Sequence, residues 1–188
     1  MFKRSLTVAL LAVSLAAGAA SAASLTYKMD PNHTDVIASW SHFGFSNPVA
    51  HFGDVDGSIT YDPANVGQSS VKVTIPMSGL ESHVPAFNEH LLSDDFFDAA
   101  KYPEITFVST RVEAAGDNKL RVFGDLTLHG VSKPVSFTFT WAAGAQPVLT
   151  GKATVKRLDF GVGGGDWADT KTIPNETAIS TIVKFNAK

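Results

Sequence analysis

The sequence predicts an all-β fold, an antiparallel barrel of eight strands with a short helical insertion between the third and fourth. From Val135 to Trp141, large apolar residues at odd positions alternate with small polar ones. Strand side chains point alternately to opposite faces, so this pattern puts four bulky residues on one face. The same alternation recurs along most of the chain, and short connections between the strands favour antiparallel neighbours. A closed barrel with an aromatic inner face could hold an apolar ligand.

The first three strands are expected before residue 76. Even-numbered residues from Val36 to His42 share the inward face of the first strand. The second strand covers residues 55–61 and ends at the turn 62–65, whose Asp-Pro-Ala-Asn sequence is typical of turns. The third strand covers residues 71–75, and the proline that follows stops it.

A helical insertion is expected between Gly79 and Pro103. Ser82 can cap a short helix, Pro85 suits its first turn, and Ala86–Leu92 is long enough for roughly two turns. The connection to the fourth strand therefore differs in kind from the short turns that precede it.

Five more strands complete the predicted barrel. The Gly-Asp-Asn turn at 116–118 and the His-Gly turn at 129–130 favour tight hairpins. A longer loop with three consecutive glycines, residues 161–175, is either a lid at the barrel mouth or a plain connection. The strands are expected around residues 105–107, 120–128, 135–141, 153–155 and 177–185.

The N-terminus is expected to be a secretory signal peptide, residues 1–22, followed by a single domain over 23–188. Lys3 and Arg4 precede an apolar run, and Ala20-Ser21-Ala22 is a small-residue cleavage site. That run is too short to span a bilayer. We therefore expect export to the periplasm, or secretion, and no transmembrane segment after cleavage.

Composition excludes several classes of partner. Removal of residues 1–22 takes away two of the 15 basic and none of the 18 acidic residues, which leaves a formal charge of −5. An acidic chain without a basic cluster argues against nucleic acid and against docking on anionic lipid. The chain has no cysteine, which rules out thiol catalysis and thiolate metal sites.

Several sequence blocks resemble the YceI-like family of exported lipocalin-like proteins. The resemblance covers essentially the whole chain after residue 22, and its two long blocks are specific. The blocks are Asp30–Thr34, His42–Gly44, Gly57–Pro63, His90–Phe107, Gly124–Pro134 and Arg157–Gly161.

This resemblance implies a lipocalin-like, eight-stranded antiparallel barrel that binds polyisoprenoids or related long-chain amphiphiles in a tubular interior. It implies no enzymatic activity. Family members often carry a Thr and an Arg-Asp pair before the His-Leu block, whereas this chain has Glu81-Ser82-His83 and Asn88-Glu89. A basic contact to a ligand head group from that segment is therefore not expected.

Candidate ligand-binding residues come from the aromatic inner faces and from polar residues near the mouth. The aromatic residues either line a ligand tube or simply fill the core, and alternation alone does not decide which. His42 shares the inward face of Trp40, where it is either a hydrogen-bonded core histidine or a contact for the polar end of a ligand. The candidates are Trp40, His42, Asn88, His90, Phe97, Phe107, Phe137, Phe139 and Trp141.

No cofactor, metal site or catalytic residue is expected. The six histidines include no pair at the three-to-five-residue spacing usual for helical zinc ligands. No nucleophile-elbow or nucleotide-binding glycine motif is present. Arg157 is interpreted as structural, with Asp159, Asp125 or Asp62 as its ion-pair partner.

We therefore expect a monomeric or homodimeric binding protein, not an enzyme, that carries a long-chain isoprenoid, quinone or fatty amphiphile. Two alternatives remain open from the sequence. One is an enzyme that acts on a small amphiphile with His42 as acid or base. The other is a barrel filled by its own side chains that acts through its surface, as a stress or adhesion protein.

Overall fold

The structure is a computed structural model, and it describes residues 24–187. The predicted signal peptide, residues 1–22, lies outside the described residues. The division of the chain into a signal peptide and one domain over residues 23–188 therefore stays a prediction. Between residues 24 and 187, no helix combines the length and the apolar character that crossing a bilayer requires. The elements are β1 (Leu25–Ser39), β2 (Val49–Phe52), β3 (Asp56–Tyr61), η1 (Val66–Gln68), β4 (Ser70–Pro76), η2 (Met77–Gly79), β5 (Leu80–Glu81), α1 (Pro85–Leu92), β6 (Glu104–Ala114), β7 (Lys119–Leu128), β8 (Val131–Ala142), β9 (Val148–Lys156), η3 (Arg157–Phe160), η4 (Gly165–Trp167) and β10 (Glu176–Ala187).

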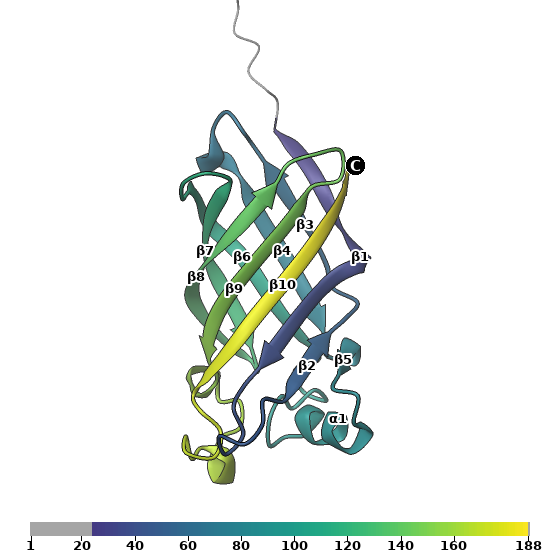
Figure 1. Ribbon diagram of the computed structural model, residues 1–188, viewed down its shortest axis with the longest axis vertical. Helices are drawn as coiled ribbons and strands as arrows, with labels where there is room; N and C mark the ends of the chain where they lie inside the picture. Colours follow the sequence, from purple (N-terminus) through teal and green to yellow (C-terminus); the bar gives the residue numbers. More distant parts are fainter. Residues whose placement is uncertain (1–23, 188) are drawn as a thin grey trace, which may run out of the picture.

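The strands close into an antiparallel barrel (Figure 1). The order around the ring is β1-β3-β4-β6-β7-β8-β9-β10, and β10 pairs with β1 to close it. The short strands extend two of these eight positions: β2 continues the position of β3 along the second half of β1, and β5 pairs with β2. The predicted eight-stranded antiparallel barrel with a short helical insertion is confirmed.

The first strand differs from its prediction at both ends. β1 begins at Leu25, well before the predicted start, and ends at Ser39, before the predicted end. The Asp-Pro-Asn-His segment at 30–33 has the composition of a turn, yet it forms an irregularity within the strand where the register shifts between Met29 and Thr34. The Asp30 carboxylate accepts a hydrogen bond from the Asn32 amide and stabilises this bulge.

The insertion forms α1, with Pro85 in its first turn as predicted. Ser82 does not cap this helix, because the residue at the cap position is Val84, whose side chain makes no capping hydrogen bond. Instead the Ser82 amide and hydroxyl donate to Oδ1 of Asn88, at 2.7 and 2.5 Å. Asn88 of α1 thus holds Ser82, in the segment before the helix, in place.

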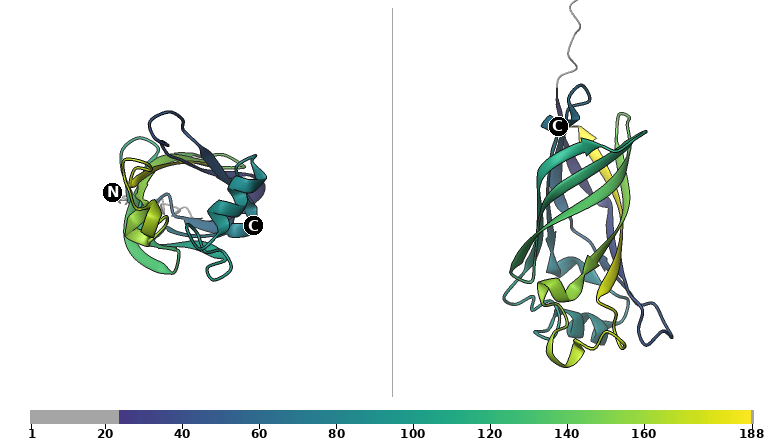
Figure 2. Two further views of the ribbon diagram at one scale, coloured as in Figure 1. Left: turned by 90° about the horizontal axis from the view of Figure 1, so that it is seen from below. Right: turned by 90° about the vertical axis from the view of Figure 1, so that its left-hand side faces the viewer.

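The two ends of the barrel are built differently. Figures 1 and 2 show the start of β1, the end of β10 and the β3–β4, β6–β7 and β8–β9 connections at one end, which we call the upper end. α1 and the 157–175 segment lie across from each other at the lower end (Figure 2). The β7–β8 turn at His129-Gly130 also lies there, with φ of 52° and 73°, which is the geometry of the predicted two-residue hairpin.

Candidate ligand-binding cavity

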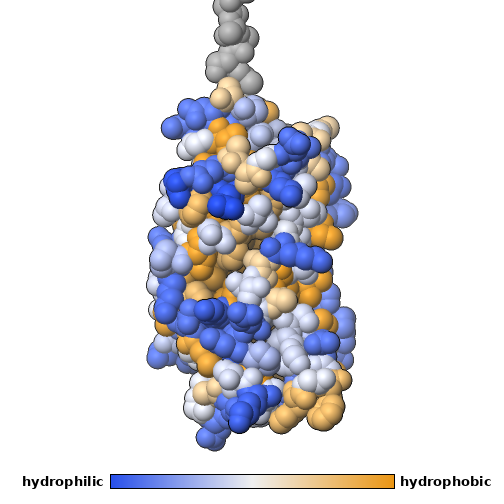
Figure 3. All heavy atoms as spheres, turned by 60° about the vertical axis from the view of Figure 1, so that its left-hand side comes forward, coloured by the Kyte–Doolittle hydropathy of each residue, from blue (hydrophilic) through white to orange (hydrophobic). Residues whose placement is uncertain are grey.

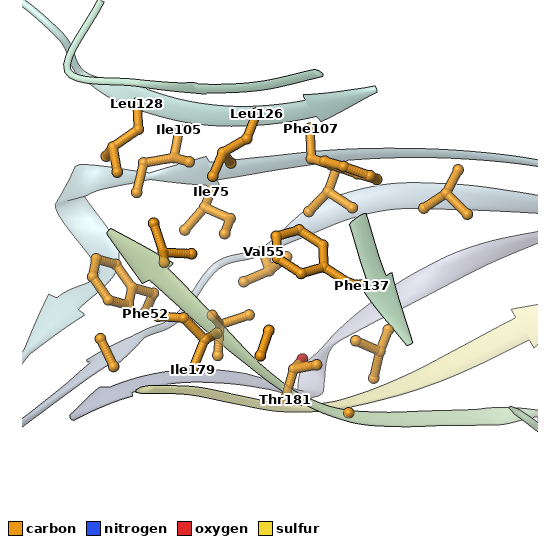
Figure 4. A pocket seen from close by; sticks show the side chains of 18 of the residues that line it. Phe52, Val55, Ile75, Ile105, Phe107, Leu126, Leu128, Phe137, Ile179 and Thr181 are labelled. Carbon is orange, nitrogen blue, oxygen red and sulfur yellow. The ribbon is translucent and has the colours of Figure 1, made fainter. Parts of the chain in front are cut away.

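The lower and middle parts of the barrel enclose a cavity of about 210 Å³. Its walls come from every strand of the ring except β3, together with Phe52 of β2 and Val55, and are almost entirely apolar, because the inward positions of the alternating strands carry aliphatic and aromatic residues. The cavity-lining residues labelled in Figure 4 are Phe52, Val55, Ile75, Ile105, Phe107, Leu126, Leu128, Phe137, Ile179 and Thr181.

The barrel is filled at its upper end and hollow below. Trp141 packs against Tyr27, Tyr61 and Phe185, with ring centroids 5.0–5.9 Å apart, and its side chain is 4% exposed. Further down, inward-facing residues such as Phe137 and Ile179 line the cavity and are only partly buried. Eight strands make a barrel that side chains can fill or that can hold one small ligand. In this chain, side chains leave the lower and middle parts open.

Glycine at inward positions helps to keep the wall thin. Gly124 on β7 lies beneath the ring of Phe107, and a Cβ at this glycine would lie 2.6 Å from Cζ of that ring. Because the glycine has no side chain, the ring can rest against the strand instead of projecting across the cavity. The aromatic side chain therefore contributes to the wall and leaves the space inside open.

Arg157 lies at the lower end of the cavity and is 5% exposed. Its guanidinium donates five hydrogen bonds to backbone carbonyls of the following loop, those of Val162, Gly163, Trp167, Ile173 and Pro174. Burial lowers the pKa of this arginine from its ordinary value. The predicted ion pairs with Asp159, Asp125 or Asp62 are wrong, because the loop carbonyls take all five donors.

The loop that Arg157 holds closes the lower end of the barrel. Val162 and Ile173 in this loop are 6% and 5% exposed, and both pack into the core. Trp167 packs edge-on against His90 of α1, with ring centroids 5.0 Å apart. The loop and the helix thus meet over the lower end.

The structure brings four predicted site residues to the cavity. Phe97, Phe107, Phe137 and Phe139 line it. Trp141 belongs instead to the aromatic cluster that fills the upper end. Whether these residues contact a ligand stays a prediction.

The other candidates lie at the lower end, outside the cavity lining. Trp40 packs against Phe87 of α1, with ring centroids 6.0 Å apart. Asn88 donates to Glu81 and accepts from Ser82, so its amide is engaged within the chain. His90 packs against Trp167, and its Nε2 lies 4.0 Å from Oδ2 of Asp95.

The inward placement of His42 was wrong. β1 ends at Ser39, so the alternation that put this histidine on the inner face no longer applies at position 42. Its amide donates to the Ser46 carbonyl in the loop that leads to β2, and its ring packs beside Phe43. The histidine therefore belongs to a surface loop.

Sequence reasoning named the aromatic wall and missed most of the aliphatic one. Val55, Ile105, Leu126 and Leu128 line the cavity. The alternating pattern that placed them on inner faces was the available signal, but it does not distinguish a residue that borders a cavity from one that packs in a filled core. Among residues 24–187, no three His, Asp or Glu side chains come close enough to hold a metal ion.

Comparisons with known proteins agree with this architecture. The sequence profile described as YceI-like domain matches residues 27–185. A UPF0312 protein of Pseudomonas putida is 36% identical over 177 residues, which cover 89% of this chain and 91% of that protein. A UPF0312 protein of Vibrio cholerae is 37% identical over 169 residues, which cover 86% and 89%.

Two solved structures share the fold. The crystal structure of Burkholderia cenocepacia BcnA matches with a TM-score of 0.79 and 30% identity, over 83% of this chain and 98% of that one. A polyisoprenoid binding domain from Saccharophagus degradans matches with a TM-score of 0.68 and 16% identity, over 87% and 99%.

Proposed function

This chain belongs to the YceI-like domain family, and we propose that it is an exported, periplasmic or secreted, binding protein that sequesters a long-chain isoprenoid or similar amphiphilic lipid inside its barrel. The observation that carries the proposal is the apolar cavity of about 210 Å³. The Saccharophagus degradans neighbour is described as polyisoprenoid binding, and at 16% identity it supports the fold. The choice of a lipid therefore depends on the cavity of this chain.

The size of the cavity determines how much of a lipid chain can lie inside the barrel. A water-sized group needs a cavity volume of about 10–15 Å³. The cavity of about 210 Å³ therefore has room for on the order of 15 groups of that size. Each buried methylene contributes about 0.8 kcal/mol. A hydrocarbon chain of about this length would gain affinity without a strong polar contact, while a polar head group would remain outside the apolar part.

The lining offers little for catalysis. Its polar members include the hydroxyls of Thr177 and Thr181 and the guanidinium of Arg157, whose donors all bind backbone carbonyls. His42, the acid or base of the alternative enzyme, lies on a surface loop outside the lining. These observations favour binding over a reaction in the barrel.

Filling the cavity from one wall tests the proposal. Val36 points into the cavity, whereas its neighbour Ile37 borders a depression on the outer wall. We expect Val36→Phe to weaken binding of farnesol at least about tenfold in native mass spectrometry titrations, because the added ring takes up chain volume. Ile37→Phe is the matched control and should bind as the unaltered protein does. Equal binding by both variants, or no binding by the unaltered protein, would contradict the proposal.

A further inference from the structure

The strand ladder of the barrel wall is interrupted between β8 and β9. These strands pair only from Phe139–Gly151 to Ala142–Val148, whereas β7 pairs with β8 at ten positions and β9 with β10 at nine. Val131–Thr138 on β8 and Lys152–Lys156 on β9 therefore face each other without a strand ladder. We call the space between these two stretches the side window.

The side window is bounded above and below. Its upper limit is the Phe139–Gly151 pair, where the ladder between β8 and β9 stops. At its lower limit, Nδ1 of His129 lies 3.1 Å from the carbonyl oxygen of Phe160 and joins the β7–β8 turn to η3. The unpaired stretch thus has contacts between its two sides at both of its ends.

The side window leads to the cavity. Phe137 on one side and Ala153 and Val155 on the other line the cavity, and all three are only partly buried. A depression on the outer wall shares Phe139, Gly151 and Thr181 with the cavity, so the wall is thin there. Figure 3 brings this side of the barrel forward and shows apolar residues recessed at mid-height between hydrophilic rims.

The two ends of the barrel offer a ligand less access. The aromatic cluster around Trp141, which is 4% exposed, fills the upper end. The loop held by Arg157 packs over the lower end together with α1. An apolar chain that passes through the side window would enter the cavity without displacing either of these packed elements.

The charges around the side window favour an anionic group. The facing stretches carry Lys133, Lys152 and Lys156 and no carboxylate, although acidic residues outnumber basic ones in the chain as a whole. Lys156 is the strand partner of Glu176, so a carboxylate lies next to this lysine. Lys133 is the strand partner of the cavity-lining Leu126, has the same parity as Phe137 and is half-buried. We infer from these three observations that its side chain points to the inner edge of the side window, next to the lining residues.

We propose that a long-chain lipid with an anionic head group enters through the side window, with its chain in the cavity and its head group at Lys133. This proposal rests on the proposed function and adds the route of the ligand and the charge of its head group. An ammonium group at the edge of an apolar cavity would form a charge-assisted hydrogen bond with a phosphate or carboxylate, about twice as strong as a neutral one.

Cross-linking the side window tests the route. The chain has no cysteine, so Ser136→Cys with Thr154→Cys places one reactive pair on the exposed faces of the two facing stretches. After bridging by a short bismaleimide, uptake of farnesyl phosphate should slow at least about tenfold. The matched control, Arg121→Cys with Thr138→Cys, bridges β7 and β8 where they already pair, and should take up the lipid at the unaltered rate.

A substitution tests the head group without closing the wall. Lys133→Gln should weaken binding of farnesyl phosphate about tenfold and leave farnesol binding unchanged, because only the charged contact is lost. Lys72→Gln, on the outer face of β4, is the control and should change neither. The lipid binding of Lys133→Gln remains informative if the variant with the two cysteines does not fold.

The outcomes separate this proposal from the proposed function. Slow uptake after cross-linking, together with a loss confined to farnesyl phosphate in Lys133→Gln, supports the side window. Unchanged uptake after cross-linking, or equal losses for both lipids in Lys133→Gln, overturns it while farnesol binding still supports a lipid carrier. If the unaltered protein takes up neither lipid, both proposals fail.

Discussion

The ring of Phe139 on β8 occupies the space that a side chain at Gly151 on β9 would need. The two residues are Cα partners, and a Cβ built on the glycine would lie 2.4 Å from Cδ1 of the ring. Both residues line the cavity, and their pair marks the upper limit of the side window. The glycine therefore lets an aromatic residue form part of the wall at the point where two strands begin to separate.

We expect Gly151→Ala to push the Phe139 ring toward the cavity. Overpacking of this kind costs about 1–3 kcal/mol of unfolding free energy and would also weaken farnesol binding. Urea unfolding and lipid titration measure the two effects. Gly144→Ala is the control, because a Cβ there meets nothing within 4 Å. If both alanine variants unfold at the same urea concentration, the close approach of ring and glycine has no energetic consequence.

Truncation should cost more in the filled part of the barrel than in the hollow part. Trp141→Ala removes a ring that packs against Tyr27, Tyr61 and Phe185, and we expect a loss of about 3–5 kcal/mol. Phe137→Ala should cost about 2 kcal/mol or less, because part of that ring already borders open space. Equal losses in urea unfolding would mean that the cavity around Phe137 is filled.

Removal of the Arg157 guanidinium should loosen the loop at the lower end. Arg157→Met leaves five backbone carbonyls without their donor, and we expect a loss of at least about 3 kcal/mol. Hydrogen exchange of residues 161–175 should rise with it. Arg157→Lys should restore only part of the protection, since an ammonium cannot reach all five acceptors. Full protection in either variant would show that the loop packs without this arginine.

The carboxylate of Glu81 should titrate below its ordinary range. Donation from the Asn88 amide and from the His83 backbone N–H lowers the pKa of this carboxylate. A lowered pKa means that the contribution of Glu81 to stability is present above the ordinary pKa of 4.5 and is lost as the pH falls through the lowered value. Carbon NMR titration should show the pKa of Glu81 rising in Asn88→Ala. A pKa at the ordinary value in the unaltered protein would rule out this effect.

The alternation of apolar and polar residues was sufficient to predict the barrel, because each strand of the ring turns one side toward the barrel interior. From Lys133 to Trp141 the odd-numbered residues of β8 are half-buried or buried and the even-numbered ones are exposed, as the pattern from Val135 to Trp141 indicates. The tight turn between β7 and β8 was equally predictable, since His129 and Gly130 adopt the left-handed backbone geometry that their residue types favour.

Strand ends and bulges were not predictable from the same pattern. His42 continues the alternation of β1 by two residues beyond Trp40, but the strand has already ended at Ser39. The bulge at 30–33 contains a proline and an asparagine, and both residue types favour a turn. In the structure the carboxylate of Asp30 accepts a hydrogen bond from the backbone N–H of Asn32, and the segment forms an irregularity within the strand. Both outcomes depend on hydrogen bonds that alternation does not encode.

The cavity and the side window are tertiary features. Alternation on β8 runs without a break through Phe139, although the ladder to β9 stops there, so the alternation does not mark where the strands separate. Pro134, which lies in the unpaired stretch, is a residue typical of strand edges. Whether inward residues meet across the barrel depends on its diameter and on the glycines beneath the rings, not on the residue types alone.

Native mass spectrometry of the protein, purified without detergent from the cells that produce it, is the most direct test of a lipid in the barrel. We expect a stoichiometric long-chain lipid that remains bound under native conditions and is released on denaturation, and its fragmentation would identify the chain and the head group. A protein that is recovered empty, and that stays empty when farnesol and farnesyl phosphate are added, would contradict the account.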